Sequence, residues 1–441
     1  MGVERTIMKK KKKVVVRAPV LTRSGYGEHG RFVLRALRTV EENFDIYVIP
    51  VNWGQTGWIY EDDEERRWLD NLITKTAHYQ NESRQKPKYD ISIQVTIPNE
   101  WNRLAPINIG VTAGIETNKV AAVWIEKANN MDKIITVSNH SKRIFLETVY
   151  DAFESINGEQ TGKIVKIKCK KEIEVVHYPV KQFEEVDLKL KLKSDFNFLS
   201  VAQWGPRKNL ENTIRWFVEE FIDNPEVGLV VKASTKGNSI TDRYHTTSMV
   251  SNLLKQYENK QCKIYLLHGD MSDQEMHSLY KHPKVKALVS LTHGEGFGLP
   301  IFEAAYSGLP VLAPEWSGHV DFLFAPKKNK KTGNEKMKAH FAKIDYNIGP
   351  IPESVVWDGV LEKDSMWCYP QQGSYKMKLR EVYKEYGRFK KQAKNLQKWV
   401  IENFEEKNQY KKFISDSLAD YALDEEMVKE KYNKFLDDLD D

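Results

Sequence analysis

The segment with the clearest chemical potential is rich in glycine and holds Glu295 and Glu303: His293-Gly-Glu-Gly-Phe-Gly-Leu-Pro-Ile-Phe-Glu303. Gly296 and Gly298 allow a sharp backbone turn that brings N–H groups close to a ligand, and Pro300 suits the first turn of a helix. Free N–H groups at a helix N-terminus favour a phosphate or polyhydroxyl ligand. Since the two carboxylates can accept hydrogen bonds from sugar hydroxyls, the string predicts a site for such a ligand.

A second segment places two cations side by side where a predicted strand passes into a helix: Val201-Ala-Gln-Trp-Gly-Pro-Arg-Lys-Asn209. Arg207 and Lys208, together with a helix N-terminus, can neutralise a diphosphate. Taken alone, the two residues also fit an ordinary surface Arg-Lys pair. Their position at the carboxyl end of a strand favours the phosphate site.

The glycine-rich string resembles the Glu-x-Phe-Gly-Leu-x-x-x-Glu signature of the retaining glycosyltransferases of family 4, which have the GT-B fold. Two following stretches resemble the same family: Ala304-Ala-Tyr-Ser-Gly-Leu-Pro-Val-Leu-Ala313 and Trp316-Ser-Gly-His-Val-Asp321. The resemblance implies that Glu295 contacts hydroxyls of the donor sugar and that Glu303 holds the ribose. It also implies that the backbone amides of Phe297, Gly298 and Leu299 meet the sugar and the phosphate.

This family usually carries a Gly-Arg pair at the first strand of its second domain, with a lysine five residues after the arginine. Lys208 matches that lysine, whereas Gln203 stands where the arginine is expected. We expect Arg207, beside Lys208, to supply the missing charge, and we place Gln203 among the donor-binding residues.

A glycine-rich segment, Ser24-Gly-Tyr-Gly-Glu-His-Gly30, lies between the first predicted strand and the first predicted helix. It resembles the first loop of these enzymes, which faces the donor diphosphate and the acceptor, so Gly25 and Gly27 are predicted to bind the donor. The segment lacks the spacing and the acidic partner of a dinucleotide-binding fingerprint. His29 is either a hydrogen-bond donor to the ligand or an exposed residue of the first helical turn.

The first domain also carries a Glu-Thr pair after a predicted strand, in Gly110-Val-Thr-Ala-Gly-Ile-Glu-Thr117. With the later turn Ile134-Ile-Thr-Val-Ser-Asn139, it resembles a subgroup of the same family. Glu116 would then face the cleft, where it orients the acceptor hydroxyl or stabilises positive charge on the sugar. The alternative is a glutamate that caps a helix. Ser138 either caps the next helix or contacts the acceptor.

The elements that position these residues follow from β-branched runs alternating with helical patterns, which predict right-handed βαβ units and parallel sheets. The predicted strands are 14–16, 46–51, 91–95, 107–111, 134–137 and 173–176, then 196–201, 227–231, 264–267, 285–290 and 311–313. An amphipathic helix is predicted over 209–223, with Asn209 as its N-cap. The last hundred residues are expected to be helical.

These patterns and the resemblance predict an α/β protein of the GT-B fold, with two Rossmann-like doubly wound domains facing a shared cleft and C-terminal helices. The predicted boundaries are 1–180 for the acceptor-side domain, 181–195 for a linker, 196–400 for the donor-binding domain and 401–441 for helices packing back across the domains. Leu and Lys alternate in the linker, which leaves an edge strand as its alternative. Ligands of parallel sheets bind beyond the carboxyl ends of the strands, so two facing sheets share one cleft.

Composition narrows the class of protein further. The 441 residues carry 67 basic and 62 acidic side chains, and this balance argues against nucleic-acid binding, which needs a concentrated basic surface. No apolar run approaches the roughly 18 residues of a spanning helix. Cys169, Cys262 and Cys368 form no Cys-x-x-Cys pair, so a reduced, cytoplasmic chain is expected. The lysine tract Lys9–Lys13 is either a weak contact to an anionic membrane surface or a solvated tail.

The resemblance therefore implies a retaining glycosyltransferase that moves a hexose from a nucleoside diphosphate sugar to a hydroxyl of a glycan, lipid or protein. Its predicted catalytic residues are Lys208, Arg207, Glu295 and Glu116. No cofactor or metal is expected, because the one Asp-x-Asp pair, Asp438-Leu-Asp440, falls in a terminal helix. The alternatives are a non-catalytic nucleotide-sugar-binding protein and a sugar-nucleotide epimerase or hydrolase on the same fold.

Specificity for the acceptor is expected to reside in loops of the first domain. The region 52–88 stands out because it contains Trp53, Trp58 and Trp68. The sequence leaves two interpretations for these rings, which either stack on sugar faces or pack inside the domain.

Overall fold

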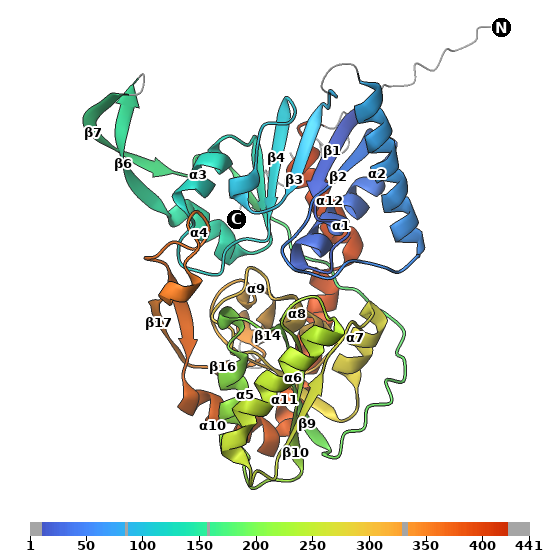
Figure 1. The fold of residues 1–441 in the computed structure, drawn as a ribbon, viewed down its shortest axis with the longest axis vertical. Helices are drawn as coiled ribbons and strands as arrows, with labels where there is room; N and C mark the ends of the chain where they lie inside the picture. The colour runs from blue at the N-terminus through green and yellow to red at the C-terminus, as the bar shows by residue number, and fades with distance from the viewer. Residues whose placement is uncertain (1–10, 84–86, 157–158, 329–333, 422–441) are drawn as a thin grey trace, which may run out of the picture.

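Two six-stranded parallel sheets, one above the other in Figure 1, organise the chain. The structure is a computed structural model, and it describes residues 11–83, 87–156, 159–328 and 334–421. The first sheet contains β1 (Lys12–Ala18), β2 (Phe44–Pro50), β3 (Ile91–Val95), β4 (Ile107–Thr112), β5 (Lys133–Thr136) and β8 (Ile173–Val175). The second contains β9 (Phe196–Gln203), β10 (Val227–Ser234), β11 (Lys263–Leu267), β12 (Val285–Val289), β13 (Val311–Pro314) and β16 (Ala342–Ile344).

The strand order fixes where ligands can bind. The first sheet has the order β2-β1-β3-β4-β5-β8 and the second the order β11-β10-β9-β12-β13-β16. The order reverses between β1 and β3 in one sheet and between β9 and β12 in the other. In open parallel sheets, ligands bind at the carboxyl ends of the strands at such a reversal. The ends of β9 and β12 carry the two segments that the sequence analysis singled out.

Helices cover both faces of each sheet, as expected for doubly wound domains. The first domain has α1 (Gly25–Arg38), α2 (Glu64–Glu82), α3 (Ala122–Asn129) and α4 (Asn139–Glu147). The second has α5 (Leu210–Glu220), α6 (Ile240–Leu254), α7 (Asp273–Lys281), α8 (Leu299–Tyr306), α9 (Val320–Leu323), α10 (Gln372–Lys384) and α11 (Tyr386–Asn403). The predicted strands and the two doubly wound domains are confirmed.

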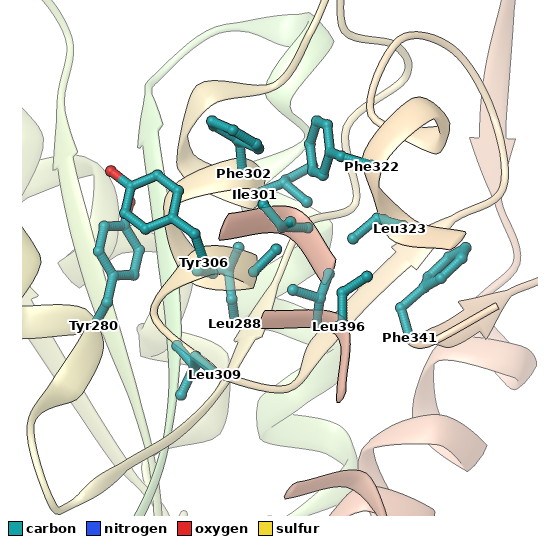
Figure 2. Packing of buried hydrophobic residues seen from close by; sticks show 14 of the residues in the cluster. Tyr280, Leu288, Ile301, Phe302, Tyr306, Leu309, Phe322, Leu323, Phe341 and Leu396 are labelled. Carbon is teal, nitrogen blue, oxygen red and sulfur yellow. The ribbon is translucent and has the colours of Figure 1, made fainter. Parts of the chain in front are cut away.

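Apolar side chains from α8 and α11 cover one face of the second sheet. Figure 2 shows this cluster, in which Ile301 and Phe302 of α8 lie near Leu396 of α11 and Leu288 of β12. On the other face, α5 and α10 contribute Phe217 and a second apolar cluster. Since α8 is held by this packing, its N-terminus has a fixed position at the edge of the sheet.

Three antiparallel hairpins were not expected from the sequence. They are β6–β7 (Val149–Ile156, Glu159–Lys168), β14–β15 (Phe324–Lys328, Glu335–Ala339) and β17–β18 (Tyr346–Pro350, Met366–Pro370). The expectation that the last hundred residues are helical is therefore wrong for 342–370. Residues 181–195 form neither helix nor strand, which excludes the edge-strand alternative.

Two local expectations near helix N-termini are also corrected. The glycine-rich segment 24–30 is not a loop, because α1 begins at Gly25 and the Ser24 side chain caps it by accepting from the N–H of Gly27. Asn209 precedes α5, but with φ at 54° it is left-handed and its side chain does not cap the helix. Ser138 does cap α4, by accepting from the N–H of Ser141.

The last described helix, α12 (Glu406–Leu418), returns to the first domain. Figure 1 shows α12 beside α1, far from α11 of the second domain. The Phe413 ring is fully buried and makes an edge contact to Phe32 of α1, with ring centroids 5.7 Å apart. In the described part of the chain, no helix is long and apolar enough to cross a membrane.

We expect Phe413→Ala to lower the free energy of unfolding by about 3–5 kcal/mol, because it leaves a cavity between α12 and α1. Urea unfolding followed by circular dichroism measures the loss. Met377→Ala, at a half-exposed position on α10, is the control and should change stability by less than about 0.5 kcal/mol. Equal stability of the two variants would mean that α12 does not stabilise the first domain.

Candidate functional site

Four charged side chains gather where the carboxyl ends of the two sheets meet. Lys208 Nζ lies 2.5 Å from Glu295 Oε1, and Arg207 Nη1 lies 3.0 Å from Glu295 Oε2. Arg207 Nε also lies 3.2 Å from Oε1 of Glu116, which belongs to the first domain. All four predicted catalytic residues are thus in one cluster, with Arg207 between the two glutamates.

The two short segments that carry this cluster are fixed by backbone contacts. Arg207 and Lys208 lie in a single 3₁₀ turn directly after β9, and the carbonyl of Arg207 accepts from the N–H of His293 at 2.8 Å. The Arg207 guanidinium donates to the carbonyl of Gly294 at 2.6 Å. The N–H of Glu295 donates to Ser317 Oγ at 2.8 Å. Both segments follow buried strands, so the sheet determines the separation of the charges.

The cluster is largely shielded from water, which strengthens its internal interactions. Burial raises the pKa of Glu295, but the neighbouring Lys208 and Arg207 lower it by more, to about 2. Burial and the adjacent charge of Arg207 lower the pKa of Lys208, against the opposing effect of Glu295. Glu295 is therefore ionised at neutral pH, and it is the carboxylate that holds both cations.

The cleft is closed at this point. A Cβ at Gly294 would overlap the carbonyl oxygen of Glu116, and one at Gly296 would overlap that of Ala113, so the glycine-rich loop lies directly against the first domain. The space lined by Lys208, Glu295 and Pro300 measures only about 10 Å³, which is the size of one water molecule. These two glycines therefore serve the contact between the domains, whereas the small space beside Lys208 and Glu295 is lined by residues of the second domain.

The N-terminus of α8 offers free donors beside the cluster. Gly298 precedes the helix with φ at 94°, a left-handed conformation that favours glycine. Within the described residues, no hydrogen bond engages the amide N–H groups of Phe297, Gly298 or Leu299. The Phe297 ring itself is buried and packs against Phe302 and Phe322. The ring of Phe297 therefore serves packing within the second domain, and a donor role of its backbone amide stays a prediction.

Glu303 lies on the first turns of α8, and its Oε2 accepts a hydrogen bond from the hydroxyl of Tyr280 at 2.7 Å. Burial raises the pKa of Glu303 to about 7, with partial opposition from that hydrogen bond. The carboxylate has no cationic partner among the described residues. It is therefore an acceptor available to a hydroxylated ligand.

The remaining predicted donor-binding residues lie outside the cluster. Gln203 ends β9, and its exposed side chain donates to the carbonyl of Thr235 at 3.2 Å. Gly25 begins α1 with open space at its Cβ position, whereas a Cβ at Gly27 would overlap Thr22. Gly25 therefore has room for a ligand, and Gly27 is required by packing within the first domain.

His29 matches neither interpretation offered by the sequence. Its side chain is buried, and its ring lies 5.1 Å from that of Tyr178. Burial lowers its pKa to about 3, so the ring is neutral at physiological pH. Among the described residues, neither ring nitrogen of His29 has a hydrogen-bond partner, so its contacts here are packing contacts.

Sequence reasoning missed a second contact between the domains. Asp321 Oδ2 accepts from the N–H of Asn139 at 2.7 Å and lies 3.0 Å from Nε2 of His177. Asp321 belongs to the second domain, whereas Asn139 opens α4 of the first. The signal available in the sequence was the motif ending at Asp321, which resembled the family but gave no role to this aspartate.

Two other features bear on what the site can hold. In the chain as described, no group of three or more His, Cys, Asp or Glu side chains could hold a metal ion, and Asp438 and Asp440 lie outside the described residues. A larger cavity of about 1070 Å³ lies on the second domain, between the β14–β15 hairpin and α11. Its lining includes Lys327, Lys336 and Lys338 but none of the four clustered residues.

Residues 182–343 match the family model described as "Glycosyl transferases group 1". This matched region contains Arg207, Lys208, Glu295 and Glu303, whereas Glu116 lies outside it. A comparison with curated proteins gave no match. Family 4 membership and retention of configuration stay predictions.

Several solved structures share the whole architecture. Sucrose-phosphate synthase from Thermosynechococcus elongatus is similar over 91% of this chain and 97% of its own, at 12% identity and a TM-score of 0.59. A glycosyltransferase from Rickettsia africae is similar over 92% of this chain and 97% of its own, at 14% identity and a TM-score of 0.54. The Anabaena protein HepE, in complex with UDP and glucose, is similar over 91% of this chain and 98% of its own, at 12% identity and a TM-score of 0.53. At these identities the likeness shows the fold, which is GT-B.

The raised pKa of Glu303 predicts that the free energy of unfolding depends on pH. The ordinary value is 4.5 and the folded value about 7, so the folded state binds more protons between these values and stability falls as pH rises through that window. Glutamine does not ionise, so we expect Glu303→Gln to raise the free energy of unfolding at pH 8 by roughly 2–3 kcal/mol relative to the wild type. At pH 4.5 the substitution should have little effect. Urea titrations at both pH values test this.

The control for this comparison is Glu126→Gln, at an exposed position on α3. It should not change the pH dependence. A Glu303→Gln variant whose stability follows the wild-type curve at both pH values would show that Glu303 is ionised in the folded state without penalty.

Proposed function

We propose that this protein is a retaining glycosyltransferase that moves a hexose from a nucleoside diphosphate sugar to a hydroxyl of a glycan, lipid or protein acceptor. The observation that carries the proposal is the cluster of Arg207, Lys208, Glu295 and Glu116 beside the free N-terminus of α8. Cations and helix amides together suit a diphosphate. The HepE structure, which contains UDP and glucose, shows that this fold accommodates such ligands in another protein.

In the proposed reaction, the bond between the sugar and the diphosphate breaks, and the diphosphate gains negative charge. Arg207 and Lys208 stabilise that charge, since preorganised donors aimed at developing charge are a main source of catalysis. When the diphosphate takes over these cations, the carboxylate of Glu295 is released to accept hydrogen bonds from the sugar. The acceptor proton passes to the departing phosphate, and Glu116 orients the acceptor hydroxyl.

Two other activities fit the same fold. A non-catalytic nucleotide-sugar-binding protein would need Glu303 but not both phosphate cations, and the pairing of Arg207 and Lys208 with Glu295 argues for catalysis. An epimerase or hydrolase would use the same donor site without an acceptor. Incubation with a radiolabelled donor separates these possibilities, because only a transferase moves the label to an added acceptor.

The proposal includes no cofactor, no metal and a cytoplasmic location. The three cysteines are free and buried, which suits a reducing compartment. Within the lysine tract, Lys12 donates to the carbonyl of Tyr421 and Lys13 lies 4.1 Å from the ring centroid of Tyr79. Lys9 and Lys10 lie outside the described residues. Weak contact of this tract with an anionic membrane stays a prediction.

Lys208→Ala should lower turnover by on the order of a hundredfold to a thousandfold, the range for removing one well-placed electrostatic donor. The rate of sugar transfer at saturating donor is the measurement. Lys376→Ala is the matched control, because Lys376 of α10 makes a similar 2.5 Å ion pair with Glu219 of α5 and should keep full turnover. Wild-type turnover in Lys208→Ala would exclude a role for this lysine in leaving-group stabilisation.

Transfer should proceed unchanged in excess EDTA, because Arg207, Lys208 and the α8 amides neutralise the diphosphate in this proposal. The assay compares initial rates with EDTA alone and with added magnesium or manganese. A rate that collapses with EDTA and returns with either ion would contradict both the metal-independent mechanism and the assignment of the phosphate site.

A further inference from the structure

A short extended segment after β2 carries large aromatic side chains on the surface. Trp58 is 53% exposed and Tyr60 is 69% exposed, whereas Ile59 between them points inward and is partly buried. Residues i and i+2 of an extended segment share a face, so Trp58 and Tyr60 stand side by side. The region 52–88 contains two other tryptophans. Trp68 packs against the apolar core of the first domain, and Trp53 packs against Tyr26.

The backbone under these two rings is held in place. Thr22 and Trp58 form an antiparallel bridge, and flanking hydrogen bonds join Arg23 to Gly57 at 2.8 Å and Ile59 to Leu21 at 2.9 Å. The Arg23 guanidinium lies 4.8 Å from the centroid of the Tyr60 ring and pairs with Glu61. Two exposed rings on a fixed support form a preorganised surface, so binding to them costs little ordering entropy.

This aromatic surface lies at the junction of the domains. In Figure 1, the segment between β2 and α2 runs along the edge of the first domain that faces the second. Arg23 donates to the carbonyl of Met271, which belongs to the second domain, at 3.4 Å. A Cβ at Gly57 would lie 3.9 Å from Asp270 of the same loop. A ligand on Trp58 and Tyr60 would therefore lie at the rim of the closed cleft.

A line of contacts leads from Trp53, which belongs to the same chain segment as Trp58 and Tyr60, towards the charged cluster. The Tyr26 ring lies 4.2 Å from that of Trp53, and its hydroxyl lies 2.8 Å from Thr112 Oγ1 at the end of β4. Thr112 Oγ1 accepts from the N–H of Gly114, two residues before Glu116. The rim and Glu116 thus belong to one continuous edge of the first domain, which suits a ligand with several units.

We propose that Trp58 and Tyr60 form a subsite for a neutral saccharide chain, which, if the proposed transferase function holds, is the acceptor. The faces of pyranose rings present C–H groups that pack on the negatively polarised faces of aromatic rings. A lipid chain would need a continuous apolar surface, and here the exposed Asn52, Gln55 and Asp62 interrupt it. Four of the five acidic side chains from Glu61 to Glu65 form ion pairs with arginines of the first domain, so the charges of this segment are largely balanced, which suits a neutral saccharide.

The test is a titration of the full chain with maltotriose, cellotriose and chitotriose, followed by tryptophan fluorescence and by calorimetry. We expect at least one of these neutral trisaccharides to bind, and Trp58→Ala and Tyr60→Ala to weaken that binding by about tenfold each. Trp357→Ala is the matched control, because Trp357 is 59% exposed and follows β17, a strand that lies on the other side of the molecule from α2 in Figure 1. It should bind as the wild type does.

The titration needs no donor, so its outcome is separate from that of the proposed transferase function, which UDP-glucose binding and transfer assays examine. Absence of trisaccharide binding in a chain that binds UDP-glucose would overturn the subsite and leave the proposed function standing. Equal weakening by Trp58→Ala and Trp357→Ala would also overturn it. So would tight binding of phosphatidylglycerol vesicles that Trp58→Ala abolishes, because the aromatic rim would then be a lipid contact. Unchanged thermal unfolding of the variants shows that they fold.

Discussion

The ion pairs of Arg207 are the interaction on which the arrangement of the site depends. Arg207 belongs to the second domain, yet it lies between Glu295 of its own domain and Glu116 of the other. Breaking a shielded pair by removing one partner leaves a buried charge without compensation, which is far more costly than the net value of the pair. Arg207 therefore links the glycine-rich loop of the second domain to Glu116 of the first.

Closure also depends on the small size of Gly294 and Gly296, which lie against the carbonyls of Glu116 and Ala113. The same loop carries Glu295 between these two glycines. Separation of the domains at this point would break the pair of Arg207 with Glu116, whereas the pairs of Glu295 with Arg207 and Lys208 lie within the second domain. Asp321, with Asn139 and His177, adds a second polar contact across the interface.

Much of the fold could be predicted because strands of parallel sheets are buried on both faces and read as continuous β-branched runs, such as Val14–Val16 and Ile91–Val95. The hairpins were missed because a sequence such as Glu335-Lys-Met-Lys-Ala339 is mostly exposed and carries no such signal. The convergence of Lys208 and Glu295 followed from their positions after β9 and β12. The pairing of Arg207 with Glu116 depends on how two domains meet, which no local pattern encodes.

The path of the chain between the domains limits how the cleft can open. The chain passes from the first domain to the second near Val180 and returns between α11 and α12 near Phe404, and the N–H of Val180 donates to the carbonyl of Phe404 at 2.8 Å. The two crossings are therefore joined to each other by a backbone hydrogen bond and connect the domains at one place. Because two chain segments tether the domains, Glu116 has a high effective concentration near Arg207, which favours the ion pair between the domains.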